Sequence, residues 1–187
     1  TSADKLLTAG GAVIDIVKDK LLIGGTAVTT TAAELNYLDG ATVVIPGKVE
    51  GTNFTGSLLV GHSTTGTLNA AQYNTGVGIA ALDALTSGDS NTGVGKSALT
   101  GVAGGVQNTG VGHNSGKNLT SGSNNTSVGF QNLYTNQGGS YNVAIGVLAL
   151  EDSTASNNTA VGTHSLKEVS DSSYNIGLGY LSGDNIT

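Results

Sequence analysis

The sequence predicts an all-β fold: a repetitive parallel β-roll or β-solenoid that builds a fibre, preceded by a short N-terminal collar with one small helix. Three observations lead to this prediction. The chain repeats itself about every 17 residues, its apolar residues are mostly small or aliphatic, and each repeat ends in residues typical of turns. A repeat of this length is too short for a β-α-β unit but suits two short strands and two turns.

The composition explains why a closed globular core is not expected. Among 187 residues there are 30 glycines and only two phenylalanines, with no tryptophan, methionine or cysteine. Hydrophobic residues still make up 37% and charged residues only 11%, which is too little charge for a typical disordered chain. Small side chains can form a dry interior where the same residue stacks on itself from coil to coil, as in solenoids.

Charge and hydropathy exclude several classes of partner. The net charge is −6 with only seven Lys and Arg residues, whereas nucleic-acid binding needs clustered basic side chains. We therefore expect no nucleic-acid partner. No apolar run approaches the roughly 18 to 20 residues of a membrane span, and the first residues do not have a signal-peptide pattern. We expect no membrane insertion.

The repeat is built on the motif Asn-Thr-Gly-Val-Gly and its variants. Successive copies are 17 residues apart, except for one step of 16, and Ser57 opens a degenerate first copy, so about eight copies fill residues 57–187. Side-chain amides stacked in this way can hydrogen-bond from coil to coil, and we assign these asparagines a structural role. They are Asn74, Asn91, Asn108, Asn125, Asn142, Asn158 and Asn175.

Two further positions of the motif are nearly constant. After Gly61 in the first copy, the last glycine recurs as Gly78, Gly95, Gly112, Gly129, Gly146, Gly162 and Gly179. The residue before it is always aliphatic: Val60, then Val77, Val94, Val111, Val128, Ile145, Val161 and Leu178. We expect these aliphatic side chains to stack in register and to face the interior.

A second apolar row follows four residues after the constant glycine. It comprises Leu82, Leu99, Leu133, Leu150 and Leu166, and is interrupted by Gly116 and Gly183. Each copy is therefore predicted to run strand, corner, strand, turn, with two inward faces. Alternation within the motif puts Thr and Val on the packing face, and Asn and the two glycines on a bare face. Glycine permits a close backbone approach, so we expect neighbouring chains to pack on that bare face.

Residues 1–56 form the predicted collar. The runs 13–17 and 20–23 are strand-like, and residues 31–39 have the capping-box spacing of a two-turn helix, closed by Asp39-Gly40. Pro46-Gly47 marks a turn before the array.

No group of residues forms a convincing reactive site, and we predict neither catalytic residues nor a metal or cofactor. His62, His113 and His164 occupy positions that vary from copy to copy, and the acidic residues are spread over corners and turns. Gly95-Lys96-Ser97 is the nearest approach to a phosphate-binding loop, but it falls within the repeat series. The protein is not expected to be an enzyme.

Two families share such coils. Asn142-Val143-Ala144-Ile145-Gly146 followed by Ala149-Leu150 resembles the head repeats of trimeric autotransporter adhesins. The 17-residue form, as in Asn74-Thr75-Gly76-Val77-Gly78 with Ala81-Leu82, is closer to repeats of bacteriophage tail fibres and other virion appendages. Residues 30–40 also look like a stretch found in fibre proteins of aquatic phages. The resemblance implies an intertwined homotrimer located in the virion, whose partners are its own copies, other virion proteins and a host-surface glycan or receptor.

Three hypotheses for function follow. The first is a structural component of a phage virion fibre, a tail-fibre shaft or similar appendage that supports host attachment. The second is a trimeric bacterial adhesin at the cell surface that binds a glycan or matrix protein. The third and weakest is an ice-binding solenoid, because Thr75, Thr92 and Thr109 begin a threonine row. Alternation predicts that these threonines face inward, and Val143 and Ile176 interrupt the row.

Overall fold

The computed structural model describes residues 22–23, 26–27, 47–51, 54–61 and 68–184. The chain divides into two compact units, Thr1–Val44 and Ile45–Thr187. In the first unit, β1 (Leu22–Ile23) pairs antiparallel with β2 (Thr26–Ala27). This confirms a strand in the predicted run 20–23. The run 13–17 and the predicted helix at 31–39 lie outside the described residues.

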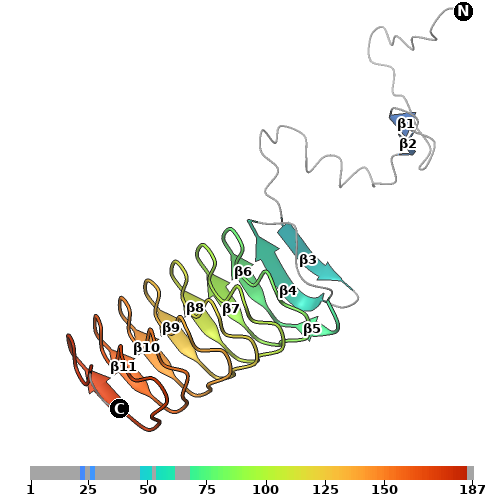
Figure 1. Cartoon of the computed structure of the whole chain (residues 1–187). Coiled ribbons are helices and arrows are strands. Elements are labelled where there is room, and N and C mark those ends of the chain that lie inside the picture. Colours follow the sequence, from blue (N-terminus) through green and yellow to red (C-terminus); the bar gives the residue numbers. More distant parts are fainter. Residues whose placement is uncertain (1–21, 24–25, 28–46, 52–53, 62–67, 185–187) are drawn as a thin grey trace, which may run out of the picture. The chain divides into compact units, whose positions relative to one another are not determined.

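The second unit is an all-β solenoid of about seven turns, and its described residues contain no helix. Its strands line up as successive rungs in one sheet (Figure 1). The sheet begins with β3 (Gly47–Gly51) and β4 (Phe54–Val60), and the short β5 (Ala71–Gln72) pairs with β4 off the main path. The remaining rungs are β6 (Thr75–Val77), β7 (Thr92–Val94), β8 (Thr109–Val111), β9 (Thr126–Val128), β10 (Val143–Ile145), β11 (Thr159–Val161) and β12 (Ile176–Leu178).

Pairing along the solenoid is parallel and keeps the repeat in register. Thr75 pairs with Thr92 and Val77 with Val94, and the same correspondence continues to β12. The predicted stacking of the aliphatic row is therefore confirmed. At the other end of the sheet, β3 runs antiparallel to β4, with Gly47 opposite Val60. The repeat array was predicted to begin at Ser57. Strand β4 begins before this residue, at Phe54, and the second compact unit begins at Ile45.

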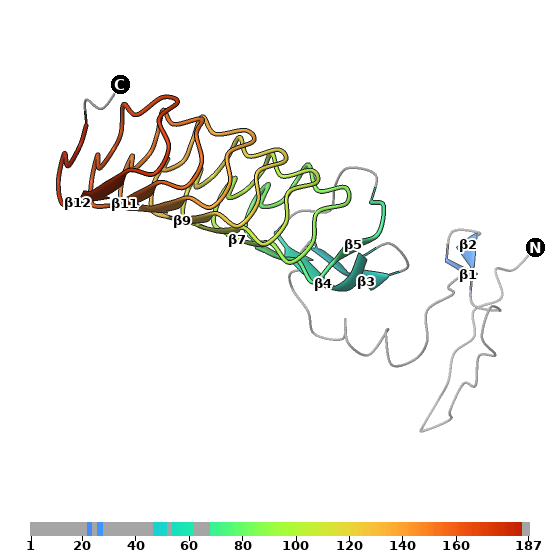
Figure 2. The same cartoon turned by 90° about the horizontal axis from the view of Figure 1, so that it is seen from below.

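Each coil from β6 onward has one strand, so the predicted second strand per copy is wrong. In Figure 2 these strands lie together along one side of the solenoid, and the rest of each coil is loop. The second apolar row is in left-handed backbone conformation, with φ of 56° at Leu82 and 49° at Leu99. A residue in this conformation turns the chain and cannot continue a strand. Successive coils are still hydrogen-bonded to each other through these loops: the Leu82 amide donates to the Ala98 carbonyl over 3.1 Å.

The interior consists of rows that run through the coils. The predicted leucine row, from Leu82 to Leu166, is fully buried, which confirms its inward direction. A second buried apolar row, three residues further on, was not predicted from the sequence. It comprises Leu85, Val102, Leu119 and Val169, with Asn136 and Ser153 at the equivalent places in the coils between.

The alternation within the motif has the opposite direction to the one predicted. The middle residue of each strand and the preceding asparagine face inward, while the Thr and Val positions face outward. The interior beneath the strands has no room for a side chain larger than Ala or Ser, the residues that occupy the middle position in β9, β10 and β11. A Cβ added at Gly76 would lie 2.4 Å from Leu59 Cδ2, and one at Gly110 would lie 2.6 Å from Leu99 Cγ. The face that carries Asn and the middle glycine is therefore the core, and no neighbouring chain can pack on it.

The asparagine row forms the predicted coil-to-coil ladder. Asn108 Nδ2 donates to Asn91 Oδ1 over 3.0 Å and to the Gly122 carbonyl over 2.8 Å. Asn108 Oδ1 accepts from both the backbone amide and Nδ2 of Asn125, each over 3.0 Å. The side chain of Asn108 thus makes four hydrogen bonds while fully buried. Such a network ties each strand to the turn of its own coil and to both neighbouring coils.

The residue before each asparagine also has a positive φ. At Gln107 the angle is 58°, and its side chain is exposed. A left-handed conformation costs a residue with a Cβ roughly 1–2 kcal/mol relative to glycine. We expect Gln107→Gly to raise the free energy of unfolding by about 1 kcal/mol, and Gln107→Ala to leave it within about 0.5 kcal/mol of the native value. Urea unfolding followed by circular dichroism measures both, and a less stable glycine variant would contradict the expectation.

Candidate interaction surface

The outward side of the sheet is the surface most suited to an interaction. We call it the outer face, defined by the first and third residues of each strand from β6 to β12. The first row is Thr75, Thr92, Thr109, Thr126, Val143, Thr159 and Ile176. The second is Val77, Val94, Val111, Val128, Ile145, Val161 and Leu178.

The outer face is uncharged, and its second row is aliphatic throughout. Val77 is 39% exposed and Ile145 is 38% exposed, although both are aliphatic residues inside a sheet. No position in either row is occupied by a charged side chain. Seven strands at the usual spacing of about 4.8 Å make a stripe roughly 30 Å long. Single exposed apolar residues are common on protein surfaces, whereas a continuous exposed apolar row often marks an interaction site.

A third row borders the outer face beyond the corner glycines. It includes Ile79, Lys96, His113, Phe130, Val147, Thr163 and Tyr180, all exposed. The His113 ring meets the Phe130 ring edge to face, with centroids 5.5 Å apart, and His164 lies beside Tyr180 at 6.2 Å. This border thus mixes aromatic and cationic groups, whereas the outer face itself has only methyl and hydroxyl groups.

The other candidates singled out from the sequence do not converge into a site. Within the described part of the chain, no three His, Cys, Asp or Glu residues are grouped so that they could hold a metal ion. His113 and His164 are on different coils, and His62 lies outside the described residues. The described residues also contain no helix long and apolar enough to cross a membrane.

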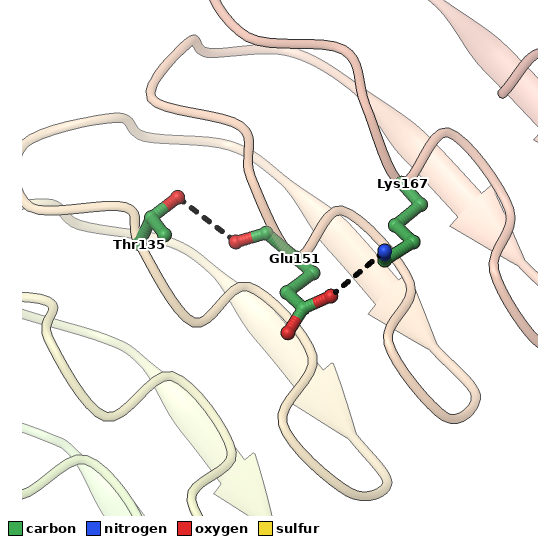
Figure 3. A network of polar contacts seen from close by, with 3 residues as sticks. All are labelled: Thr135, Glu151 and Lys167. Carbon is green, nitrogen blue, oxygen red and sulfur yellow. Dashed lines mark hydrogen bonds and ion pairs between the residues drawn. The ribbon is translucent and has the colours of Figure 1, made fainter. Parts of the chain in front are cut away.

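The acidic residue Glu151 has a local structural partner. Its carboxylate lies 3.5 Å from Lys167 Nζ on the next coil, and its carbonyl accepts a hydrogen bond from Thr135 Oγ1 of the preceding coil (Figure 3). Lys117 Nζ lies 5.6 Å from the centre of the Tyr134 ring in the same row of the repeat. These contacts link successive coils along one flank. A partly exposed surface pair of this type contributes about 1 kcal/mol or less.

The segment Gly95-Lys96-Ser97 does not form an anion-binding loop. The Gly95 amide donates to the Val77 carbonyl and the Ser97 amide donates to the Ile79 carbonyl, each over 2.8 Å. A phosphate-binding loop needs such amides to point toward the ligand. Here they join two coils of the solenoid, so the glycines at this corner serve the fold.

Sequence reasoning named the residues of the outer face but assigned them to the core. The missing information was the width of the interior, which excludes side chains larger than Ala or Ser beneath the strands. One signal was present in the sequence, since five threonines alternate with the aliphatic row. A hydroxyl is costly to bury without a partner, which favours an outward position.

Comparison with protein-family models, with curated proteins and with solved structures finds no match to this chain.

Proposed function

We propose that the chain is a shaft segment of a homotrimeric virion fibre of a phage, which spans distance stiffly and supports host attachment. The outer face is the observation that carries this proposal. An uncharged apolar stripe along the whole solenoid is unfavourable in water, and copies of the same chain offer an equally long and equally spaced stripe. Three copies can bring these stripes together around one axis parallel to the solenoid.

The fold supports a mechanical role for each chain. Every coil is joined to the next by backbone pairing, by the asparagine ladder and by stacked leucines. In a repeat array of this kind each coil contacts only its two neighbours, and the contacts between coils repeat along the whole rod. The exposed loops can vary without disturbing these contacts. The resemblance of the repeat to those of phage appendage fibres supports a virion as the location for this role.

Light scattering coupled to size-exclusion chromatography tests the assembly. We expect the chain to elute at three chain masses, one chain being 18.4 kDa. Val111→Lys places an ammonium group in the middle of the outer face, and a threefold assembly would bury three of them at several kcal/mol each. This variant should run as a folded monomer. Ala84→Lys, on an exposed position outside the outer face, should stay trimeric.

A monomeric native chain would contradict the trimer. The fibre proposal would equally fail if Val111→Lys stayed trimeric, because the outer face would then not hold the copies together. Circular dichroism of Val111→Lys distinguishes dissociation from unfolding.

One observation favours a second candidate, an ice-binding solenoid. The threonine row faces outward on a regular sheet, for example Thr92 and Thr109 in register, and not inward as alternation had indicated. Evenly spaced hydroxyl and methyl groups on an uncharged face are suited to ordering water. This function needs the outer face free, so it is an alternative to the trimer. A native chain that is monomeric and changes the shape of growing ice crystals at micromolar concentration would support it.

A further inference from the structure

A conflict between backbone and side chain occurs on the flank of the solenoid next to the outer face. The residue before each ladder asparagine is left-handed, with φ between 57° at Tyr73 and 66° at Tyr174. Glycine and asparagine tolerate this conformation best, and Asn124 and Asn157 occupy two of these places. Tyrosine is a poor choice there. Tyr73, Tyr141 and Tyr174 nevertheless occupy three of the seven places.

All three rings are exposed, but only Tyr73, 63% exposed, lies against another part of the fold. A Cβ added at Gly56 would lie 2.9 Å from Tyr73 Cδ1, so the Tyr73 ring lies against Gly56 of β4. Tyr141 is 62% exposed and Tyr174 is 81% exposed. Within the described part of the chain, neither of their rings has an aromatic or cationic partner, and neither hydroxyl has a hydrogen-bond partner. Gln107 has the same backbone conformation and is also exposed, so the feature that distinguishes Tyr141 and Tyr174 is an exposed aromatic ring without a partner among the described residues.

Tyr141 and Tyr174 occupy equivalent positions two layers apart. Tyr141 precedes Asn142 and Tyr174 precedes Asn175, and both asparagines are hydrogen-bonded to Asn158 in the layer between, each over 2.9 Å. Two strand spacings amount to about 10 Å along the solenoid. Two successive sugar units of an extended, equatorially linked chain span a similar length. Both rings can therefore stack under one such chain.

The groups between the rings are neutral hydrogen-bonding groups. Asn157 occupies the layer between the two tyrosines, and its side chain makes no hydrogen bond to another described residue. Ser156 Oγ accepts from the Ser140 amide over 2.9 Å, and Ser173 Oγ accepts from the Ser156 amide over 3.4 Å. Each of these two hydroxyls keeps its own proton available for donation. The surface thus offers apolar rings flanked by amide and hydroxyl groups.

We propose that Tyr141 and Tyr174 form a two-ring platform that binds a neutral, extended β-1,4-linked saccharide chain. The apolar C–H faces of alternate sugar units stack on the rings, and the sugar hydroxyls bond to Asn157 and Ser156. Asp171 is exposed on the same coil as Tyr174 and disfavours an anionic sugar. This inference rests on the proposed fibre, whose contact with a host surface glycan it would supply along the shaft.

Asparagine substitutions provide the test, because this residue already fills the same position in two coils. Isothermal titration of the full chain with cellohexaose and with chitohexaose should show binding of at least one of them. Tyr141→Asn and Tyr174→Asn should each weaken that binding by roughly tenfold, the loss of one aromatic contact. Gln107→Asn, which introduces the same residue at the equivalent position of a coil outside the platform, should leave the affinity unchanged.

Stability separates a lost contact from a damaged fold. Both tyrosine variants should melt at or above the native temperature, because asparagine relieves the left-handed strain. The platform is overturned if neither hexasaccharide binds the native chain, or if both variants bind as tightly as the native chain. A trimer without saccharide binding would remove the platform and leave the fibre intact. A monomer that binds saccharide through the two tyrosines would support the platform and contradict the fibre.

Discussion

Replacing Asn108 by alanine is expected to lower the free energy of unfolding by about 3–5 kcal/mol, one of the two largest effects of a single substitution in the array. The change removes four hydrogen bonds at once. It also leaves the Asn125 amide without its acceptor and the Gly122 carbonyl without its side-chain donor, in a place where water cannot reach them. Each buried polar group left unsatisfied costs about 1–3 kcal/mol.

Asn118→Ala is the matched control for this prediction. Asn118 is also an asparagine of the same coil, but it is partly exposed and its side chain makes no hydrogen bond to another described residue. Its replacement should change stability by less than about 0.5 kcal/mol. Urea unfolding of the two variants, followed by circular dichroism, makes the comparison. Equal stabilities would mean that the ladder contributes nothing beyond the backbone pairing.

The contrast between these two asparagines shows which features of the fold can be predicted from the sequence. The 17-residue spacing identifies Asn108 as part of a series and separates it from Asn118, which has no equivalent in the other copies. Register, parallel stacking, the amide ladder and the leucine row all follow from that spacing. They depend only on which residues are equivalent from coil to coil, and a repeat states this directly.

The direction of each row could not be predicted in the same way. Alternation shows that Asn and the middle residue share one face while Thr and Val share the other, but not which face is inside. Hydrophobicity favoured Val111 as the inward residue. The interior has no room for it, because a Cβ at the neighbouring Gly110 would already meet Leu99 at 2.6 Å. The width of a coil depends on where the chain turns, and left-handed leucines at the corner are not visible as a sequence pattern.

The same limit applies to the candidate site. All residues of the outer face were recognised as a series, so their positions were predicted and their exposure was not. The sequence offers six aromatic residues as candidates for sugar stacking: Tyr73, Phe130, Tyr134, Tyr141, Tyr174 and Tyr180. The structure distinguishes Tyr141 and Tyr174 within this set, because the other four rings each contact another described residue.

The corner glycines carry the second large prediction. Gly112 has a φ of 131°. A Cβ added there would clash with the Gly129 carbonyl on the next coil, because it would lie 2.0 Å from the carbonyl oxygen. Gly112→Ala therefore combines a backbone conformation that costs about 1–3 kcal/mol with a steric clash of similar size. We expect it to lower the free energy of unfolding by roughly 3–5 kcal/mol.

The clash cannot be relieved by moving the coils apart, and this makes the prediction informative. The Gly112 amide donates to the Val94 carbonyl and the Gly129 amide to the Val111 carbonyl, both over 2.8 Å, so the corner is held at the spacing of the sheet. Gly138→Ala is the control, since its φ is not positive and its nearest atom, Ser121 Oγ, would be 3.6 Å from the new Cβ. That change should be neutral or stabilising by about 0.4–1 kcal/mol. If Gly112→Ala proved as stable as Gly138→Ala, the coils could not be stacked through backbone contact at this corner, and the sheet register from β8 to β9 would have to differ from the one described.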